Sequence, residues 1–150
     1  MSDNWLILIP AAADFVPSVE GQERAVALMR EIAPGAEGIL GEVSEHPRFI
    51  YCGGNFERIL CPDCGKEIVT ERWSEAMDEE HPLNFPLRPR TLPCCGSKRN
   101  LNELIYEWPQ GFARFSLEAK NPGIPQIPGE VTGRFERIFG CRVKVIWRHL

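Results

Sequence analysis

Four cysteines in two close groups are the residues of this sequence best suited to chemistry. Cys61 and Cys64 are separated by two residues, Cys94 and Cys95 follow about thirty positions later as neighbours, and a glycine comes directly after each group. Thiolates grouped at tight turns are the ligands of tetrahedral Zn²⁺ sites, and glycine lets the backbone turn so that its amides point at the sulfur atoms. The sequence therefore predicts a zinc site formed by Cys61, Cys64, Cys94 and Cys95.

The turn around the first pair resembles the knuckle of the zinc-ribbon family. The residues that carry this resemblance are Ile59-Leu60-Cys61-Pro62-Asp63-Cys64-Gly65-Lys66. In that family a second, similar knuckle completes the site, but here Leu92 stands where its first cysteine would be. The resemblance covers the middle of the chain only, and it implies a structural role for zinc rather than a reaction.

The irregular second group leaves the identity of the fourth ligand open. Adjacent cysteines both reach one ion only with a strained local backbone, so Cys52 or His81 is the alternative to one of them. A set of four thiolates leaves no position for water, whereas catalytic zinc keeps one open and commonly has His or carboxylate ligands. We therefore expect a structural ion.

The segments on either side of this site repeat one order of elements. Apolar runs and period-two alternation predict strands at residues 5–9, 39–44, 115–119 and 143–147. Apolar residues at helical spacing predict one helix that begins near Ser18 and another across residues 131–139. Two strand–helix–strand halves that share a sheet predict an α+β fold, the ferredoxin-like β-α-β…β-α-β sandwich. Its halves are residues 1–46 and 109–150.

Residues 47–108 are predicted to form an inserted zinc-ribbon-like module. Thr70 is placed to begin a short helix, and a strand is expected at residues 105–108. The aromatic stretch 106–112 suits either packing between module and sandwich or recognition of a partner. Because so small a module has few candidates for a core, zinc is expected to hold it together.

Composition places the chain among ordinary globular proteins. It has 150 residues, of which 43% are hydrophobic and 25% charged, with six cysteines. It contains no run near the roughly 18 apolar residues that span a bilayer, and its apolar start has no basic flank typical of a signal peptide. We therefore expect a cytoplasmic location with no membrane contact, where cysteines bind metal rather than form disulfides.

Charge is distributed unevenly along the chain. The net charge is −4, and residues 1–50 hold 8 acidic side chains against 3 basic ones. An acidic first third argues against coating of nucleic acid, which needs a field of Lys and Arg. One stretch without acids, between His81 and Asn102, contains a possible basic binding patch formed by Arg88, Arg90, Lys98 and Arg99.

Three classes of function remain from the sequence. The favoured one is a non-enzymatic protein-binding module with structural zinc. It resembles in kind, without a shared motif, the small bacterial immunity proteins that neutralise toxins, and it predicts an acidic face from residues 14–45 for a basic partner. One alternative is a nucleic-acid-binding zinc ribbon that uses the basic patch. The other is a thiol enzyme with Cys52 as nucleophile.

Overall fold

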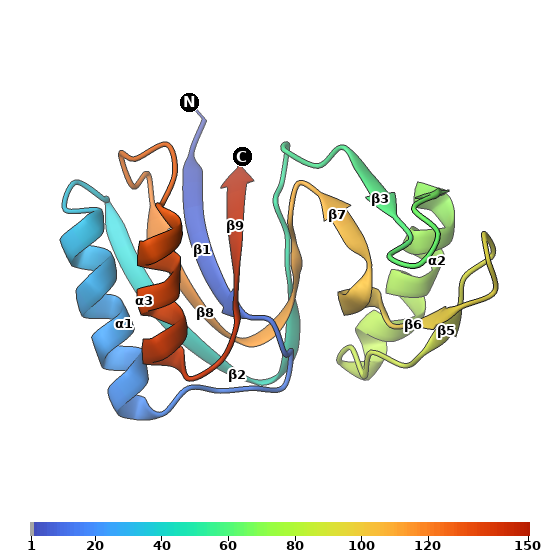
Figure 1. The fold of residues 1–150 in the computed structure, drawn as a ribbon, viewed down its shortest axis with the longest axis horizontal. Coiled ribbons are helices and arrows are strands. Elements are labelled where there is room, and N and C mark those ends of the chain that lie inside the picture. The colour runs from blue at the N-terminus through green and yellow to red at the C-terminus, as the bar shows by residue number, and fades with distance from the viewer. Residues whose placement is uncertain (1) are drawn as a thin grey trace.

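The computed structural model describes residues 2–150 as a mixed α+β protein with three α-helices and antiparallel sheets. Figure 1 shows two parts side by side, a larger one that contains both ends of the chain and a smaller one formed by its middle. Among residues 2–150, no helix has the length and apolar character to cross a membrane.

The larger part is built on a four-stranded sheet. Its strands are β1 (Asn4–Pro10), β2 (Gly38–Ile50), β8 (Gly111–Lys120) and β9 (Val143–His149). They lie in the order β2-β8-β1-β9, and every neighbouring pair is antiparallel. The four strands predicted from the sequence are confirmed, although β2 and β8 extend further than their patterns indicate.

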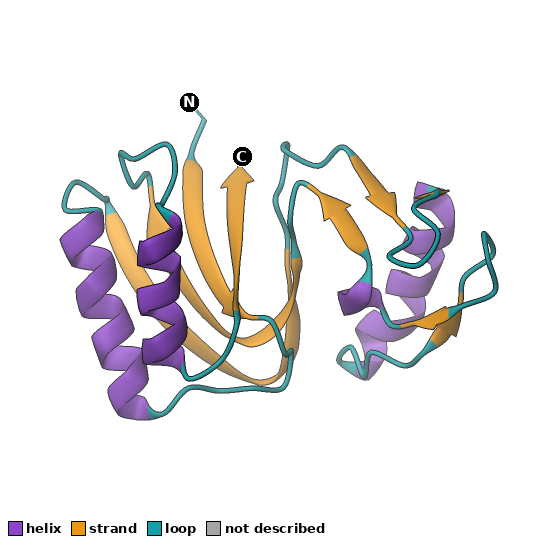
Figure 2. Ribbon diagram, in the orientation of Figure 1, coloured by secondary structure: helices purple, strands orange, loops and turns teal. Residues whose placement is uncertain are grey.

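Helices α1 (Val19–Ile32) and α3 (Gly129–Phe139) cover one face of this sheet (Figure 2). The helix predicted near Ser18 is confirmed, since the Ser18 hydroxyl accepts a hydrogen bond from the Gly21 amide at 3.0 Å. Between helices and sheet lies a core whose largest members are fully buried: Leu6, Leu8, Met29, Phe115, Leu117 and Phe135. Burial of each such side chain contributes roughly 1.5–3 kcal/mol to folding, so this core holds the two helices on the sheet.

The smaller part consists of short elements. They are β3 (Arg58–Leu60), β4 (Glu67–Ile68), α2 (Thr70–Glu80), the 3₁₀ turns His81–Leu83 and Leu101–Glu103, β5 (Arg90–Thr91), β6 (Lys98–Arg99) and β7 (Ile105–Glu107). Strands β4, β3 and β7 form one small sheet, and β5 pairs with β6 in a separate hairpin. The short helix predicted here is confirmed, but its N-cap is Val69 rather than Thr70, and no side-chain hydrogen bond caps it.

Strand β2 connects the two parts because it bends and continues. Its register against β8 shifts between Val43 and Arg48, and pairing then resumes as far as Ile50. The strand therefore runs past residue 46, where the sequence placed the end of the sandwich.

An aromatic cluster fills the junction between the two parts. Phe49 of β2 lies 5.2 Å from Phe112 and 5.7 Å from Trp73, measured between ring centroids. Tyr106 is buried, and its hydroxyl accepts a hydrogen bond from the Trp73 indole at 3.0 Å. Packing, one of the two roles considered for the stretch 106–112, is confirmed for Tyr106 and Phe112, whereas Trp108 is 43% exposed.

Candidate metal centre

Two hairpin turns carry the four cysteines, and their backbones are the same. In the turn between β3 and β4, the Cys61 amide donates to the Lys66 carbonyl at 2.9 Å, and the Gly65 amide donates to the Cys61 carbonyl at 3.0 Å. In the turn between β5 and β6, the amides of Leu92 and Gly96 make the equivalent bonds, to Ser97 at 2.8 Å and to Leu92 at 2.9 Å. Leu92 is thus the structural counterpart of Cys61.

Both turns depend on a glycine in the left-handed region. The φ angles of Gly65 and Gly96 are 75° and 76°, which other residues adopt only with strain. The equivalence of the turns makes Cys95 the counterpart of Cys64. Cys94 has no counterpart with a thiol, because Asp63 occupies the matching position.

The four sulfur atoms lie close enough together to share one ion. The Sγ atoms of Cys61, Cys64, Cys94 and Cys95 all lie within 4.8 Å of one another. The sulfurs of Cys61 and Cys95 are 3.8 Å apart, and those of Cys94 and Cys95 are 4.0 Å apart. A tetrahedral site with Zn–S bonds of about 2.3 Å places its sulfurs about 3.8 Å from one another. The spacing therefore fits a tetrahedral thiolate site.

The alternative ligands lie elsewhere. Cys52 is fully buried in a separate cluster with Ile7 and Ile9 of the sheet. His81 follows α2, and its ring packs edge-on against Phe85 with a centroid distance of 5.7 Å. Neither Cys52 nor His81 belongs to the cluster of residues whose ligand atoms are close enough to share one ion.

Leu92 explains why the second turn can lack a cysteine at the usual place. Its side chain is 7% exposed and packs in the module's hydrophobic cluster with Ile59, Ile68 and Leu101. The second turn therefore uses this position for packing and brings a thiol to the site from Cys94, two residues later.

The thiols of the cluster differ in how readily they ionise. Burial opposes ionisation of Cys61, but hydrogen bonds from the backbone amides of Cys64 and Asp63 outweigh it and lower its pKa to about 6. Burial and hydrogen bonds with the neighbouring thiols raise the pKa of Cys94 to about 12. An ion that takes all four thiolates must therefore displace protons, which makes its affinity depend on pH.

A network of ion pairs formed by Arg99, Asp63 and Glu103 lies beside the two cysteine turns. Arg99 on β6 donates to both carboxylate oxygens of Asp63, at 2.7 and 2.9 Å, and to Glu103 at 3.1 Å. Hydrogen bonds from Arg99 and then Ser97 lower the pKa of Asp63 to about 2. Because Asp63 lies in the first turn and Arg99 follows the second, this ion pair joins the two turns directly.

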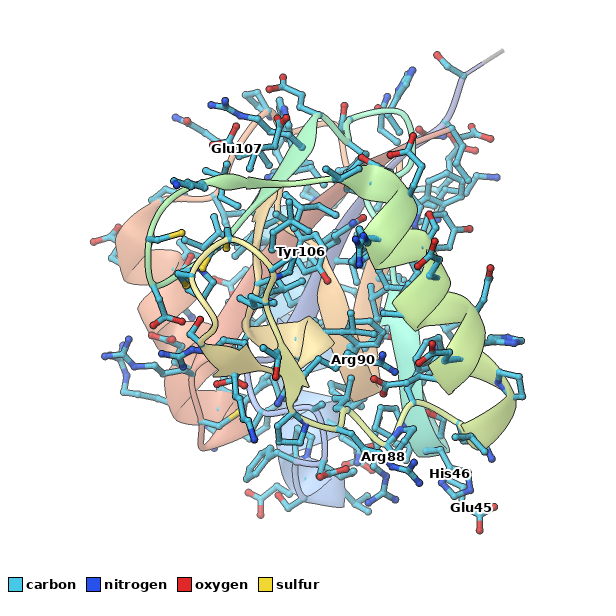
Figure 3. All side chains as sticks on the ribbon, turned by 90° about the vertical axis from the view of Figure 1, so that its right-hand side faces the viewer. Glu45, His46, Arg88, Arg90, Tyr106 and Glu107 are labelled. Carbon is cyan, nitrogen blue, oxygen red and sulfur yellow. The ribbon has the colours of Figure 1, made fainter. Side chains whose placement is uncertain are left out.

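A second ion pair anchors the β5–β6 hairpin to α2. Arg90 donates to Glu80 at 2.9 Å and to Glu79 at 2.8 Å, and Figure 3 shows it beside α2. Glu80 is only 1% exposed, and it also accepts the Leu87 amide at 2.7 Å. A charge so deeply buried is stable only while its partners remain in place.

These two networks change the predicted basic patch. Arg90 and Arg99 both neutralise carboxylates of the module itself. Arg88 and Lys98 are exposed, as predicted. The patch of four cations therefore offers fewer free charges than the sequence indicates.

The prediction of Cys52 as a nucleophile is wrong. Its side chain is fully buried, its Sγ lies 3.3 Å from the Gln110 Oε1 as a hydrogen-bond donor, and burial raises its pKa. A reactive thiol needs access and a lowered pKa. The residue lies in the segment that follows β2 and packs against Ile7, Ile9 and Ile146 of the sheet.

Sequence reasoning missed the two ion-pair networks. Asp63 and Arg99 are 36 positions apart, and no local pattern links them. The buried Glu80 stands in an acidic run, where every carboxylate looks equally exposed. The one sequence feature that pointed to these networks was the stretch without acids between His81 and Asn102, because it contains both Arg90 and Arg99.

Comparison of the chain with protein-family models, with curated proteins and with solved structures finds no match in any of the three. The function must therefore be argued from the arrangement of the residues.

Proposed function

We propose that this chain is a non-enzymatic protein-binding module of the cytoplasm, stabilised by one structural Zn²⁺ and of the kind that neutralises toxins. The observation that carries the zinc assignment is the cluster of four sulfurs within 4.8 Å of one another. Cys61, Cys64, Cys94 and Cys95 would fill all four positions of a tetrahedral ion and leave none for a substrate or water.

The short elements of the module support a structural role for the ion. Strands β4, β5 and β6 have only two residues each, and isolated hairpins of that size are marginal in water. Structural zinc contributes on the order of 10 kcal/mol to small peptide folds at neutral pH. We infer that this part is a zinc-ribbon-like module. Its two equivalent cysteine turns and the addition of β7 to the β3–β4 hairpin support this inference.

The topology of the larger part supports a ferredoxin-like arrangement. Each half contributes a strand, a helix and a strand, and the sheet order β2-β8-β1-β9 places the first strands of the two halves, β1 and β8, at the centre. Both helices cover one face. This assignment concerns the scaffold and implies no activity.

The distribution of charge supports a protein as the partner. Residues 14–45 hold only two basic side chains and seven acidic ones, all of which are exposed. The acidic residues are Asp14, Glu20, Glu23, Glu31, Glu37, Glu42 and Glu45. They lie on and around α1 and the first half of β2. An acidic face speeds association with a basic protein and repels the phosphates of nucleic acid. The engagement of Arg90 and Arg99 within the module weakens the nucleic-acid alternative further.

Capture of partners from the natural host tests this proposal. The zinc-loaded, tagged chain is incubated with host lysate, with and without nuclease, and retained molecules are identified. The proposal predicts one protein that is retained after nuclease treatment and released as salt rises. Loss of every retained molecule on nuclease treatment would contradict it and favour a nucleic-acid reader.

A further inference from the structure

The two edges of the four-stranded sheet differ in how they are protected. At the β9 edge, Glu136 accepts the Val143 amide at 3.0 Å, and Asn55 donates to the Trp147 carbonyl at 3.0 Å. The segment after β2 covers the end of the same edge, where the Gly54 amide donates to the His149 carbonyl at 2.8 Å. Side chains and a returning segment therefore occupy outward backbone groups of β9 at Val143, Trp147 and His149.

The other edge, β2, is open over its first half. Residues 38–43 pair with β8 on one side, and β2 is the terminal strand of the sheet. Natural proteins commonly protect such an edge with Lys, Pro or a bulge. Residues 38–43 contain no Lys or Pro, and the bulge with Pro47 comes only after them. The outward amides and carbonyls of this stretch can pair with another strand.

The side of this edge that faces α1 has two hollows. One, of about 310 Å³, lies at Gly41 and is lined by Val26, Glu23 and Arg30. The next, of about 400 Å³, lies at Gly38 and Ile39. Gly41 leaves the first hollow without a side chain from β2, whereas Ile39 lines the second and Arg30 borders both. The apolar surfaces of Val26 and Ile39 can contact apolar side chains that alternate along an added strand.

The opposite side of the edge is acidic. Leu40, which is 54% exposed, and Glu42 alternate with the residues that face α1. Glu42 lies 3.5 Å from Arg48, but its side chain is 48% exposed and its second oxygen is available to a further cation. Glu45 stands beyond it, and Figure 3 shows Glu45 and His46 projecting away from the molecule.

From these features we propose that residues 38–43 of β2 bind an extended basic segment of the partner protein by strand addition. The segment has apolar side chains toward α1 and Lys or Arg toward Leu40 and Glu42. Main-chain hydrogen bonds supply affinity, and the alternating side chains supply specificity. This inference rests on the proposed protein-binding function and names the chemistry of the partner.

A synthetic peptide of about nine residues that alternates Val and Lys tests the proposal directly. Its binding to the zinc-loaded chain is measured by calorimetry, and amide hydrogen exchange locates it. The proposal predicts that exchange slows in residues 38–43 and not at the β9 edge. The same peptide with N-methylated backbone amides keeps every side chain but cannot form the ladder, so it should not bind.

Two variants separate the contributions of shape and charge. Gly41→Val places a side chain in one hollow, and an added Cβ there meets Val26 and Phe115 only at 3.5–3.6 Å, so the fold should tolerate it. Glu42→Lys reverses the charge at the edge, and we expect either variant to weaken peptide binding about tenfold. Glu71→Lys on the exposed side of α2 is the matched control and should leave binding unchanged.

Three results would overturn the proposal. They are equal binding of the N-methylated peptide, binding without protection of residues 38–43, and a dimer of the chain alone that already protects these amides. A partner captured from lysate that leaves β2 exchange unchanged would refute strand addition while the protein-binding function stands. Absence of any captured protein would refute the function itself.

Discussion

The two cysteine turns share a backbone and differ in how they supply ligands. Cys61 and Cys64 occupy the two ends of the first turn, whereas the second turn has Leu92 and Cys95 at these places and adds Cys94 between them. Leu92 packs in the module's core. Backbone hydrogen bonds therefore set the shape of such a turn, while the position of a ligand can move along it by two residues.

Loss of a ligand from the regular turn should have the largest effect. Cys61→Ser removes one of four thiolates and should let the module unfold, because we propose that zinc holds its two-residue strands. We expect loss of bound zinc and exchange of the module's amides faster by about a hundredfold or more, with the sandwich core protected. Native mass spectrometry and hydrogen exchange measure both. Cys141→Ser, outside the cluster, is the control, and equal zinc loss in this variant would contradict the assignment.

Moving the thiol of the second turn from position 94 to position 92 tests whether the two turns are equivalent. Cys94→Ser alone should lose zinc as Cys61→Ser does, while Leu92→Cys combined with Cys94→Ser restores a regular turn and should bind zinc again. The rescued variant loses the packing of Leu92, so it should be less stable than the natural chain by about 1–3 kcal/mol. Zinc titration with a chromogenic chelator follows the binding. Failure of the double variant to bind would show that the turns are not equivalent.

The ion pair behind the second turn should matter less than the ligands. Glu80→Gln leaves Arg90 without its buried partner, and we expect a loss of about 3 kcal/mol in the free energy of unfolding of the zinc-loaded module. Glu79→Gln removes the exposed partner of the same guanidinium and should cost less than about 1 kcal/mol. Urea denaturation followed by amide hydrogen exchange in α2 compares the two. Similar costs would mean that burial of Glu80 does not govern this contact.

Loss of the ion pair between Asp63 and Arg99 should have the smallest effect on zinc binding near neutral pH. Because the pKa of Asp63 is lowered to about 2, its ion pair with Arg99 contributes fully above the ordinary value of about 4 and is lost only as pH falls toward 2. Asp63→Asn should therefore shift zinc retention by a constant small amount between pH 7 and 5. Acid release in that window then reflects competition between protons and the ion for the thiolates. Retention curves that converge above pH 5 would contradict this.

Much of the larger part was predictable because its patterns are local. Phe115, Leu117 and Ala119 alternate with polar residues and do face the helices, and Ser18 does cap α1. The extension of β2 to Ile50 was not predictable, since Pro47 interrupts the pattern and distant β8 supplies the pairing. The sandwich boundary in the sequence consequently fell inside a strand.

The four cysteines of the candidate metal centre were predictable from the sequence, whereas the contacts that hold its two turns in place were not. The spacing of Cys61 and Cys64 and their following glycine indicated the first turn directly. The role of Cys94 required knowing that Leu92 turns into the core, which depends on contacts with Ile59 and Leu101 from other elements. The ion pairs of Arg90 and Arg99 likewise join residues that only the fold brings together.

The mass of the purified chain under native and denaturing conditions tests the central claim most directly. We expect the native mass to exceed the denatured mass by one zinc ion, a chelator to remove the difference, and Cys61→Ser to abolish it. Equal native and denatured masses for a chain purified without chelator would contradict a zinc centre at Cys61, Cys64, Cys94 and Cys95.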